Sequence, residues 1–192
     1  YIDNPEITTR ELMEYMPGPD FPTGGIIANK SGLAEIYETG SGKIKLRGKI
    51  DIELGKRKAD KDKMVITEIP YTMIGAGINK FLVDVAELVE SKKLTDVVDI
   101  SNQSNKDGIR IVPELKKDAD VEKIRNILYK KTKLEDTYGV NMLAIAGGRP
   151  ETLNLKGILK NYLDFQYHNA TRKYQALLEK ELEKKEIKEG LI

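Results

Sequence analysis

Basic and apolar side chains alternate along residues 43–50, and this alternation is the feature that most constrains the fold. The basic residues share the odd positions: Lys43, Lys45, Arg47 and Lys49. The apolar residues share even positions: Ile44, Leu46 and Ile50. Because successive side chains of a β-strand point to opposite faces, the pattern predicts a strand with one cationic face and one face packed against a core.

The four basic residues, called the basic stripe from here on, are spaced for contact with the backbone of DNA. Side chains on one face of a strand repeat about every 6.6–6.8 Å, and phosphates along one strand of DNA repeat on a similar scale. A lysine-rich face also suits an edge strand that is protected against aggregation, and the alternation alone fits this interpretation at least as well. No acid lies between the basic residues on that face, which adds weight to the contact with DNA.

The alternating segment continues to Leu54 and is expected to form a β-hairpin with residues 64–69, across a polar tip. Helical spacing of apolar residues predicts an amphipathic helix at about 77–93, and Asp120 is expected to cap another helix. Strands and helices alternate with hairpins among them, so the sequence predicts an α+β fold with a mixed, largely antiparallel sheet and packed helices. Further strands are predicted by short apolar runs at 26–28, 97–100, 109–112 and 140–146.

The chain begins with a short helix and a loop rich in proline and glycine. Thr8 to Glu11 form a capping-box pattern, and Pro17 is expected to end the helix that follows. Residues 17–25 hold three prolines and three glycines, which excludes the interior of a helix or strand. Phe21 gives this loop one apolar anchor.

No proline interrupts the sequence from Asn154 to Gly190, so one helix of roughly 50 Å is expected. Its tail, from Glu179 to Glu189, is nearly all Glu and Lys, with opposite charges one turn apart. Apolar and aromatic residues recur at spacings of three and four, as in one arm of a coiled coil: Tyr167, Ala170, Tyr174 and Leu177. The sequence thus predicts three parts: a helix and linker from an upstream domain at 1–24, an α+β domain at 25–153 and a coiled-coil helix at 154–192.

Composition and spacing exclude several classes of site. The chain has no cysteine, which excludes disulfides, cysteine-ligated zinc and thiol nucleophiles. Its single histidine, His168, has one carboxylate four residues before it, Asp164, and one carboxylate does not make a metal site. No apolar run of about 18 residues is present, so no membrane contact is expected. The net charge of +1 leaves any nucleic-acid role to the local arrangement of charge.

Two further patterns are weak. Gly75-Ala76-Gly77 precedes a predicted helix, but Lys80 stands where a dinucleotide-binding loop needs its third glycine, so the glycines are expected to ease the start of the helix. Asp60 and Asp62 lie among lysines at the hairpin tip and fit a solvated turn better than a cation site. We therefore nominate no catalytic residue, no metal ligand and no cofactor within this chain.

Residues 17–25, Pro17-Gly18-Pro19-Asp20-Phe21-Pro22-Thr23-Gly24-Gly25, resemble a signature of the A subunit of bacterial type IIA topoisomerases, DNA gyrase and topoisomerase IV. Each motif of that family is weak by itself, but an ordered set is specific, and it covers essentially the whole chain. The further matches run in the same order: Tyr37-Glu38-Thr39-Gly40, Thr67-Glu68-Ile69-Pro70-Tyr71, Asp107-Gly108-Ile109-Arg110-Ile111, Gly139-Val140-Asn141-Met142, Asn154-Leu155-Lys156, Thr171-Arg172 and Glu189-Gly190-Leu191.

The resemblance implies part of an ATP-dependent, cytoplasmic DNA topoisomerase, which is an isomerase. In that family two A subunits cut both strands of a duplex through a tyrosyl-phosphate ester, while a second duplex passes through the gap. The B subunit hydrolyses ATP and supplies the magnesium site, in an A2B2 complex. The Arg-Tyr-Thr-Glu-like motif of the catalytic tyrosine does not occur in this sequence. That tyrosine is therefore expected upstream of Tyr1, and the chain alone is expected to be inactive.

Within the family, the chain corresponds to the tower domain, which flanks the cleavage core and supports bent double-stranded DNA, and to the outgoing helix of the coil that leads to the exit gate. The resemblance therefore places the basic stripe against the DNA backbone. The sequence differs from the family pattern in two places, so contacts that relatives make at these positions are not expected here. Gly75 and Gly77 stand where the family usually has a Lys and an Arg, and Asn102-Gln103-Ser104-Asn105 replaces an acidic run.

Two alternative functions belong to other classes. A stand-alone hydrolase could use a pair of the many carboxylates, but the sequence shows no convergent catalytic motif. A coiled-coil interaction module without DNA binding would explain the last helix but not the basic stripe. The sequence does not separate DNA gyrase from topoisomerase IV.

Overall fold

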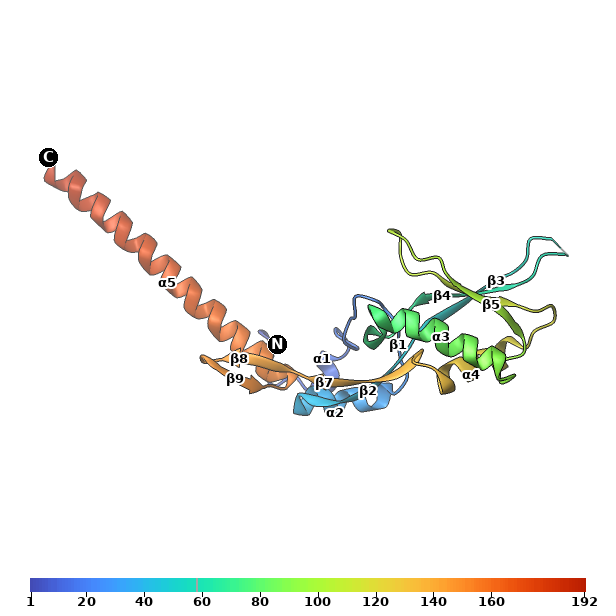
Figure 1. The fold of residues 1–192 in the computed structure, drawn as a ribbon. Coiled ribbons are helices and arrows are strands. Elements are labelled where there is room, and N and C mark those ends of the chain that lie inside the picture. Colours follow the sequence, from blue (N-terminus) through green and yellow to red (C-terminus); the bar gives the residue numbers. More distant parts are fainter. Residues whose placement is uncertain (58) are drawn as a thin grey trace. The chain divides into compact units, whose positions relative to one another are not determined.

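The computed structural model describes residues 1–57 and 59–192 (Figure 1). Lys58, in the predicted hairpin tip, lies outside the described residues. Helices and antiparallel strand pairs occur together, and a long helix ends the chain, so the predicted α+β class is confirmed. The part boundaries predicted at 24 and 153 stay predictions. The chain forms two compact units, of which the first comprises Tyr1–Tyr15, Ala34–Ser41 and Asn141–Ile192, and the second Met16–Leu33 and Gly42–Val140.

The described residues form short strands, two 3-10 turns and helices of very different length. The strands are β1 (Ile26–Ile27), β2 (Ser41–Arg47), β3 (Lys49–Glu53), β4 (Lys63–Glu68), β5 (Val97–Asn102), β6 (Ile111–Leu115), β7 (Glu135–Asn141), β8 (Leu143–Ala146) and β9 (Arg149–Thr152). The α-helices are α1 (Thr9–Leu12), α2 (Leu33–Thr39), α3 (Ala76–Glu90), α4 (Val121–Lys131) and α5 (Leu155–Gly190), and the turns are η1 (Lys30–Gly32) and η2 (Tyr71–Met73). The strand orders within the sheets are β1-β2-β7, β3-β4-β6-β5 and β8-β9.

The predicted hairpin is confirmed for β3 and β4, which pair antiparallel with Glu53 opposite Lys63. On its other edge β4 pairs with β6, and β6 pairs with β5, both antiparallel. The prediction of one continuous strand over 43–54 was wrong. The chain leaves the sheet of β1, β2 and β7 at Gly48 and continues as β3 in the four-stranded sheet.

Close packing at Gly48 explains this change of sheet. The Gly48 N–H donates to the carbonyl of Leu134 at 2.8 Å. A Cβ at this position would lie 2.8 Å from the carbonyl oxygen of Glu68 and would collide with the side chain of Leu134. Real Cβ atoms do not approach backbone oxygens so closely, so only glycine fits where the two sheets meet.

The core of the second unit lies between the four-stranded sheet and helices α3 and α4. Spacings of three and four place Phe81, Val85 and Leu88 on one buried face of α3, which confirms the helix predicted at 77–93. The predicted cap of α4 is also confirmed, because Asp120 Oδ1 accepts a hydrogen bond from the backbone of α4. The sheet and α4 contribute further buried side chains: Met64, Ile66, Ile111, Leu115, Ile124 and Leu128.

The first unit is built around the start of α5, and the predicted long helix is confirmed. Asn154 caps it by accepting a hydrogen bond from the N–H of Gly157 at 2.7 Å. Among the residues described, Leu12, Tyr37 and Leu155 form a small buried core here. The capping box predicted at Thr8 to Glu11 forms in α1. No helix in the described ranges combines the length and apolarity needed to cross a membrane.

The single strand predicted at 140–146 is divided, because β7 ends at Asn141 and β8 begins at Leu143. Met142 between them donates its N–H to the carbonyl of Gly40 at 2.8 Å and accepts a hydrogen bond from Leu153 at 3.0 Å. These bonds take Met142 out of a regular ladder. Strand β8 then turns back into β9 through two glycines that have positive φ angles.

Candidate nucleic-acid interface

Strand β2 carries the first three residues of the basic stripe on its exposed face. Lys43, Lys45 and Arg47 are exposed, whereas Ile44 and Leu46 between them are 0% and 1% exposed. The alternation read from the sequence therefore holds along β2. Burial of the two apolar side chains fixes which face of the strand points to solvent, because a shift by one residue would reverse it.

On the side where the short strand β1 ends, a side chain continues the hydrogen bonding to β2. Asn29 follows the short strand β1, and its Nδ2 donates to the carbonyl of Lys43 at 3.1 Å. Its Oδ1 accepts from the N–H of Lys45 at 2.7 Å. No local pattern in the sequence points to Asn29, because the bonds join it to residues 14 and 16 positions later. The side chain of Asn29 thus pairs the carbonyl of Lys43 and the N–H of Lys45.

Arg47 differs from the lysines because the fold brings an acid and an aromatic ring to it. Its guanidinium forms an ion pair with Glu135 of β7 and lies 5.1 Å from the centre of the Tyr129 ring in α4. The Tyr129 hydroxyl donates to the carbonyl of Gly48 at 2.7 Å, and burial raises the pKa of this phenol. Arg47 is therefore fixed in place, and part of its charge is neutralised.

Lys49 begins β3, and the sign of charge changes after it. The exposed face of β3 continues with Asp51 and Glu53. Asp51 accepts a hydrogen bond from Thr67 at 3.1 Å. Hydrogen bonds from Arg110, at 2.8 and 2.9 Å, hold the pKa of Glu53 below its usual value. The basic stripe thus ends at Lys49. Among the described residues, its three lysines form no ion pair within 4 Å.

The proline- and glycine-rich loop packs against one other motif segment, Thr67 to Tyr71, and against Tyr138, all in the second unit. The ring of Phe21 lies 6.2 Å from that of Tyr71 and 5.0 Å from that of Tyr138. The N–H of Gly25 donates to the carboxylate of Glu68 at 2.7 Å. Gly24 has a φ of 68°, and a Cβ there would lie 2.6 Å from the same carboxylate. These motif residues hold loops and sheets together, so their role in the fold is structural.

Residues 1–192 match the family model that describes the A subunit of DNA gyrase/topoisomerase IV. The chain belongs to this family. The family resemblance stated from the motifs is therefore confirmed.

Curated relatives in this gyrase/topoisomerase IV family are similar along the whole chain. The DNA gyrase A subunit of Clostridium acetobutylicum is 48% identical over 190 residues, which are 99% of this chain and 22% of the relative. The DNA topoisomerase 4 A subunit of Staphylococcus epidermidis is 40% identical over 192 residues, 100% of this chain and 23% of the relative. The probable chloroplastic/mitochondrial DNA gyrase A subunit of Oryza sativa is 41% identical over 191 residues, which are 100% of this chain and 20% of the relative. The chain spans about a fifth of the length of these relatives.

The weak patterns of this gyrase/topoisomerase IV family member have structural explanations. Gly75 precedes α3 with a φ of 69°, which glycine adopts without strain. Asp60 and Asp62 accept hydrogen bonds from the N–H groups of Arg57 and Gly55, and so close the hairpin tip. His168 lies exposed in α5. Within residues 1–57 and 59–192 no group of three His, Cys, Asp or Glu side chains is placed to hold a metal ion.

Proposed function

We propose that this chain is the tower segment in the A subunit of a type II DNA topoisomerase, and that its basic stripe supports duplex DNA beside the cleavage site. Family membership supplies the context, and the exposed, unpaired lysines of β2 and β3 supply the chemistry. Lysine side chains bind phosphates as point charges and do not read bases. The expected contact therefore favours a bent duplex without preference for sequence.

One observation carries this proposal: the two lysines of β2 project from a strand that is fixed on both sides. Ile44 and Leu46 anchor the buried face, and Asn29 pairs with the carbonyl of Lys43 and the N–H of Lys45. A fixed backbone lowers the entropy that must be lost when a charged side chain meets a phosphate. Protection of a sheet edge by lysines does not explain this geometry, because β2 lies between β1 and β7 in its sheet.

The rest of the enzyme is proposed from the family. The complete protein would act as an ATP-dependent isomerase in the cytoplasm, with two A subunits and two ATPase B subunits in an A2B2 complex. The B subunit would hold magnesium and ATP, and the catalytic tyrosine would lie in a part of the A subunit outside this chain. We expect the chain by itself to neither cleave nor relax DNA.

Helix α5 would connect the tower to the exit gate as one arm of a coiled coil. Its stripe of apolar and aromatic residues lies open to solvent, with exposures of 78% for Tyr167, 66% for Tyr174 and 47% for Leu177. Side chains of this kind are normally covered by a second helix. The same exposure supports the second candidate, a coiled-coil interaction module without DNA binding.

Energy transfer between dyes on the two ends of a duplex tests the DNA-supporting role. Adding the chain to unrelated duplexes of equal length should raise the transfer in each, because bending brings the ends together. A plasmid assay under the same conditions should show no relaxation. If the chain binds no duplex at low salt but binds a helical partner through α5, the coiled-coil candidate is correct.

A further inference from the structure

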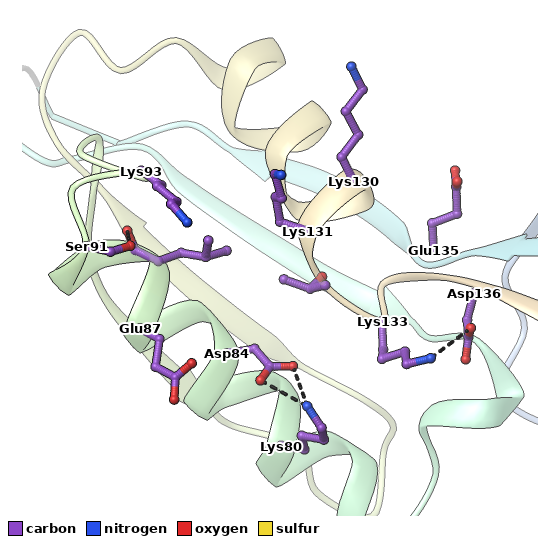
Figure 2. A pocket seen from close by; sticks show the side chains of 12 residues that line it. Lys80, Asp84, Glu87, Ser91, Lys93, Lys130, Lys131, Lys133, Glu135 and Asp136 are labelled. Carbon is purple, nitrogen blue, oxygen red and sulfur yellow. Dashed lines mark hydrogen bonds and ion pairs between the residues drawn. The ribbon is translucent and has the colours of Figure 1, made fainter.

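A charged groove of about 590 Å³ lies between α3 and the end of α4 (Figure 2). Its walls come from α3 and the turn after it, from the last residues of α4, and from the start of β7. The lining is dominated by lysines and carboxylates. A lining of this kind suits a charged ligand, whereas sites for small organic molecules are mostly apolar.

Two of the lysines in the groove are neutralised within it. Lys80 Nζ lies 3.1 Å from Asp84 Oδ1, and Lys133 Nζ lies 3.2 Å from Asp136 Oδ1 (Figure 2). Burial alone would raise the pKa of Asp136, but hydrogen bonds from Thr72, from the backbone and from Lys133 outweigh it and lower that pKa. These pairs leave little free charge on their side of the groove.

The remaining charges are mostly positive. Lys93, Lys130 and Lys131 also line the groove, and among the described residues none of them has an ion pair within 4 Å. Among the described acids that line the groove, Glu87 alone has no ion pair within 4 Å. Asp84 and Asp136 pair with lysines of the groove, and Glu135 pairs with Arg47. Lysines in the last turn of a helix complement its dipole, and this accounts for the presence of Lys130 and of Lys131 in α4. The dipole of α4 does not explain why Lys93, from the turn after α3, enters the same groove (Figure 2).

Glu135 joins this groove to the basic stripe. Its carboxylate is paired with Arg47, and its side chain also forms part of the groove wall. The ring under the Arg47 guanidinium belongs to Tyr129, which directly precedes Lys130 in α4. The stripe and the groove therefore meet at Arg47 and Glu135, within one compact unit.

We propose that the groove is a second phosphate-binding surface, which takes the backbone of the same duplex DNA beyond Arg47 through Lys93, Lys130 and Lys131. This proposal rests on the proposed function of the basic stripe and extends its footprint onto α4. Lysine heads on flexible stems can follow phosphates without fixed geometry. Each phosphate that they neutralise releases counterions and steepens the salt dependence of binding.

Binding of the 192-residue chain to a fluorescent duplex at several salt concentrations tests the groove. A variant with Lys130→Gln and Lys131→Gln keeps the helix propensity of lysine but removes both charges. The slope of log K against log salt should become shallower by about 1.8, since each lost phosphate contact removes about 0.9. The matched control carries Lys116→Gln and Lys117→Gln, which lie before α4 and do not line the groove. Equal slopes for the two double variants would overturn the proposal.

Acetylation of lysines, read by mass spectrometry with and without duplex, gives a second readout that does not depend on variants. Lys93, Lys130 and Lys131 should be protected by the duplex, whereas Lys117 should react as before. If Lys45→Gln makes the slope shallower while the groove lysines stay reactive, the groove proposal is wrong and the stripe stands. If Lys45→Gln also leaves the slope unchanged, both proposals are wrong.

Discussion

Apolar side chains are buried in the core of the second unit but mostly exposed along α5 of the first. In the second unit, the sheet, α3 and α4 bury a shared core in which Phe81, Val85 and Leu128 are 0% exposed. In the first unit, α5 extends over 36 residues and buries only Leu155 among the residues described. A unit with its own core can hold a charged face in a fixed place. A helix without one depends on a partner for most of its tertiary stabilisation.

Local interactions alone support the far part of α5. Lys184 pairs with Glu181 at 2.8 Å and Lys185 with Glu189 at 3.8 Å, both one turn apart. Exposed pairs of this kind contribute only about 0.2–0.5 kcal/mol each. The contrast teaches that the same chain contains one part that is stabilised by packing and one part whose apolar side chains lie exposed.

Truncation of one large side chain in each unit should give the largest contrast. Phe81→Ala removes a fully buried ring, and we expect the free energy of unfolding to fall by about 3–5 kcal/mol. Leu182→Ala on α5, where the side chain is 50% exposed, should change it by less than about 0.5 kcal/mol. Urea denaturation followed by circular dichroism measures both. Similar losses for the two variants would contradict the contrast between the packed core of the second unit and the exposed side chains of α5.

The join between the two sheets should be the next most sensitive place. Gly48→Ala forces a Cβ against Leu134 and the backbone of Glu68, so we expect a loss of about 1–3 kcal/mol. Gly139→Ala is the matched control, because a Cβ there meets nothing within 4 Å. The same denaturation experiment measures both. A Gly48→Ala variant as stable as its control would show that the packing at this join is looser than described.

Loss of one apolar side chain from α5 should have an effect of intermediate size. We expect the chain to self-associate at high concentration through its exposed stripe, and Leu177→Gln to weaken the association about tenfold, which corresponds to about 1.4 kcal/mol. Sedimentation equilibrium over a range of concentrations measures the association, with Lys180→Gln as control. A strict monomer in which amides 170–188 are fully protected from hydrogen exchange would contradict the idea of an uncovered arm.

Local signals made much of this fold predictable. The predicted caps Asp120 and Thr8 form hydrogen bonds within three residues, so their sequence neighbourhood contains all the information needed. The faces of β2 and α3 follow from short periodic patterns for the same reason. The basic side chains of β2 could therefore be assigned to the solvent face from the sequence.

The parts that could not be predicted depend on residues far apart in the chain. The alternation continues through Gly48, and nothing near it shows that Leu134 and Glu68 will close on this position. In the same way, the acid beside Arg47 is Glu135, 88 positions away. The groove of α3 and α4 is a product of packing, so a pattern search along the sequence does not find it.

Substitution of Glu135 should give the smallest effect. It compares Arg47, whose charge is paired, with the lysines of the basic stripe, whose charges are not paired among the described residues. Glu135→Gln removes the acid that competes with a phosphate for Arg47, so affinity for duplex DNA should rise about 1.4- to fivefold, as for an exposed ion pair of about 0.2–1 kcal/mol. Glu122→Gln removes the carboxylate that pairs with Arg125 at 2.7 Å near the start of α4, and it serves as control. Fluorescence anisotropy at fixed salt measures both. Weaker binding by the Glu135 variant would mean that the ion pair positions Arg47 for DNA.

The salt dependence of duplex binding tests most directly whether the basic stripe contacts the DNA backbone. A variant with Lys43→Gln and Lys45→Gln should lower the slope of log K against log salt by about 1.8, because two phosphate contacts are lost. A variant with Lys184→Gln and Lys185→Gln, on the charged tail of α5, should keep the slope of the unaltered chain. Parallel lines for all three proteins would show that β2 does not lie against the DNA backbone.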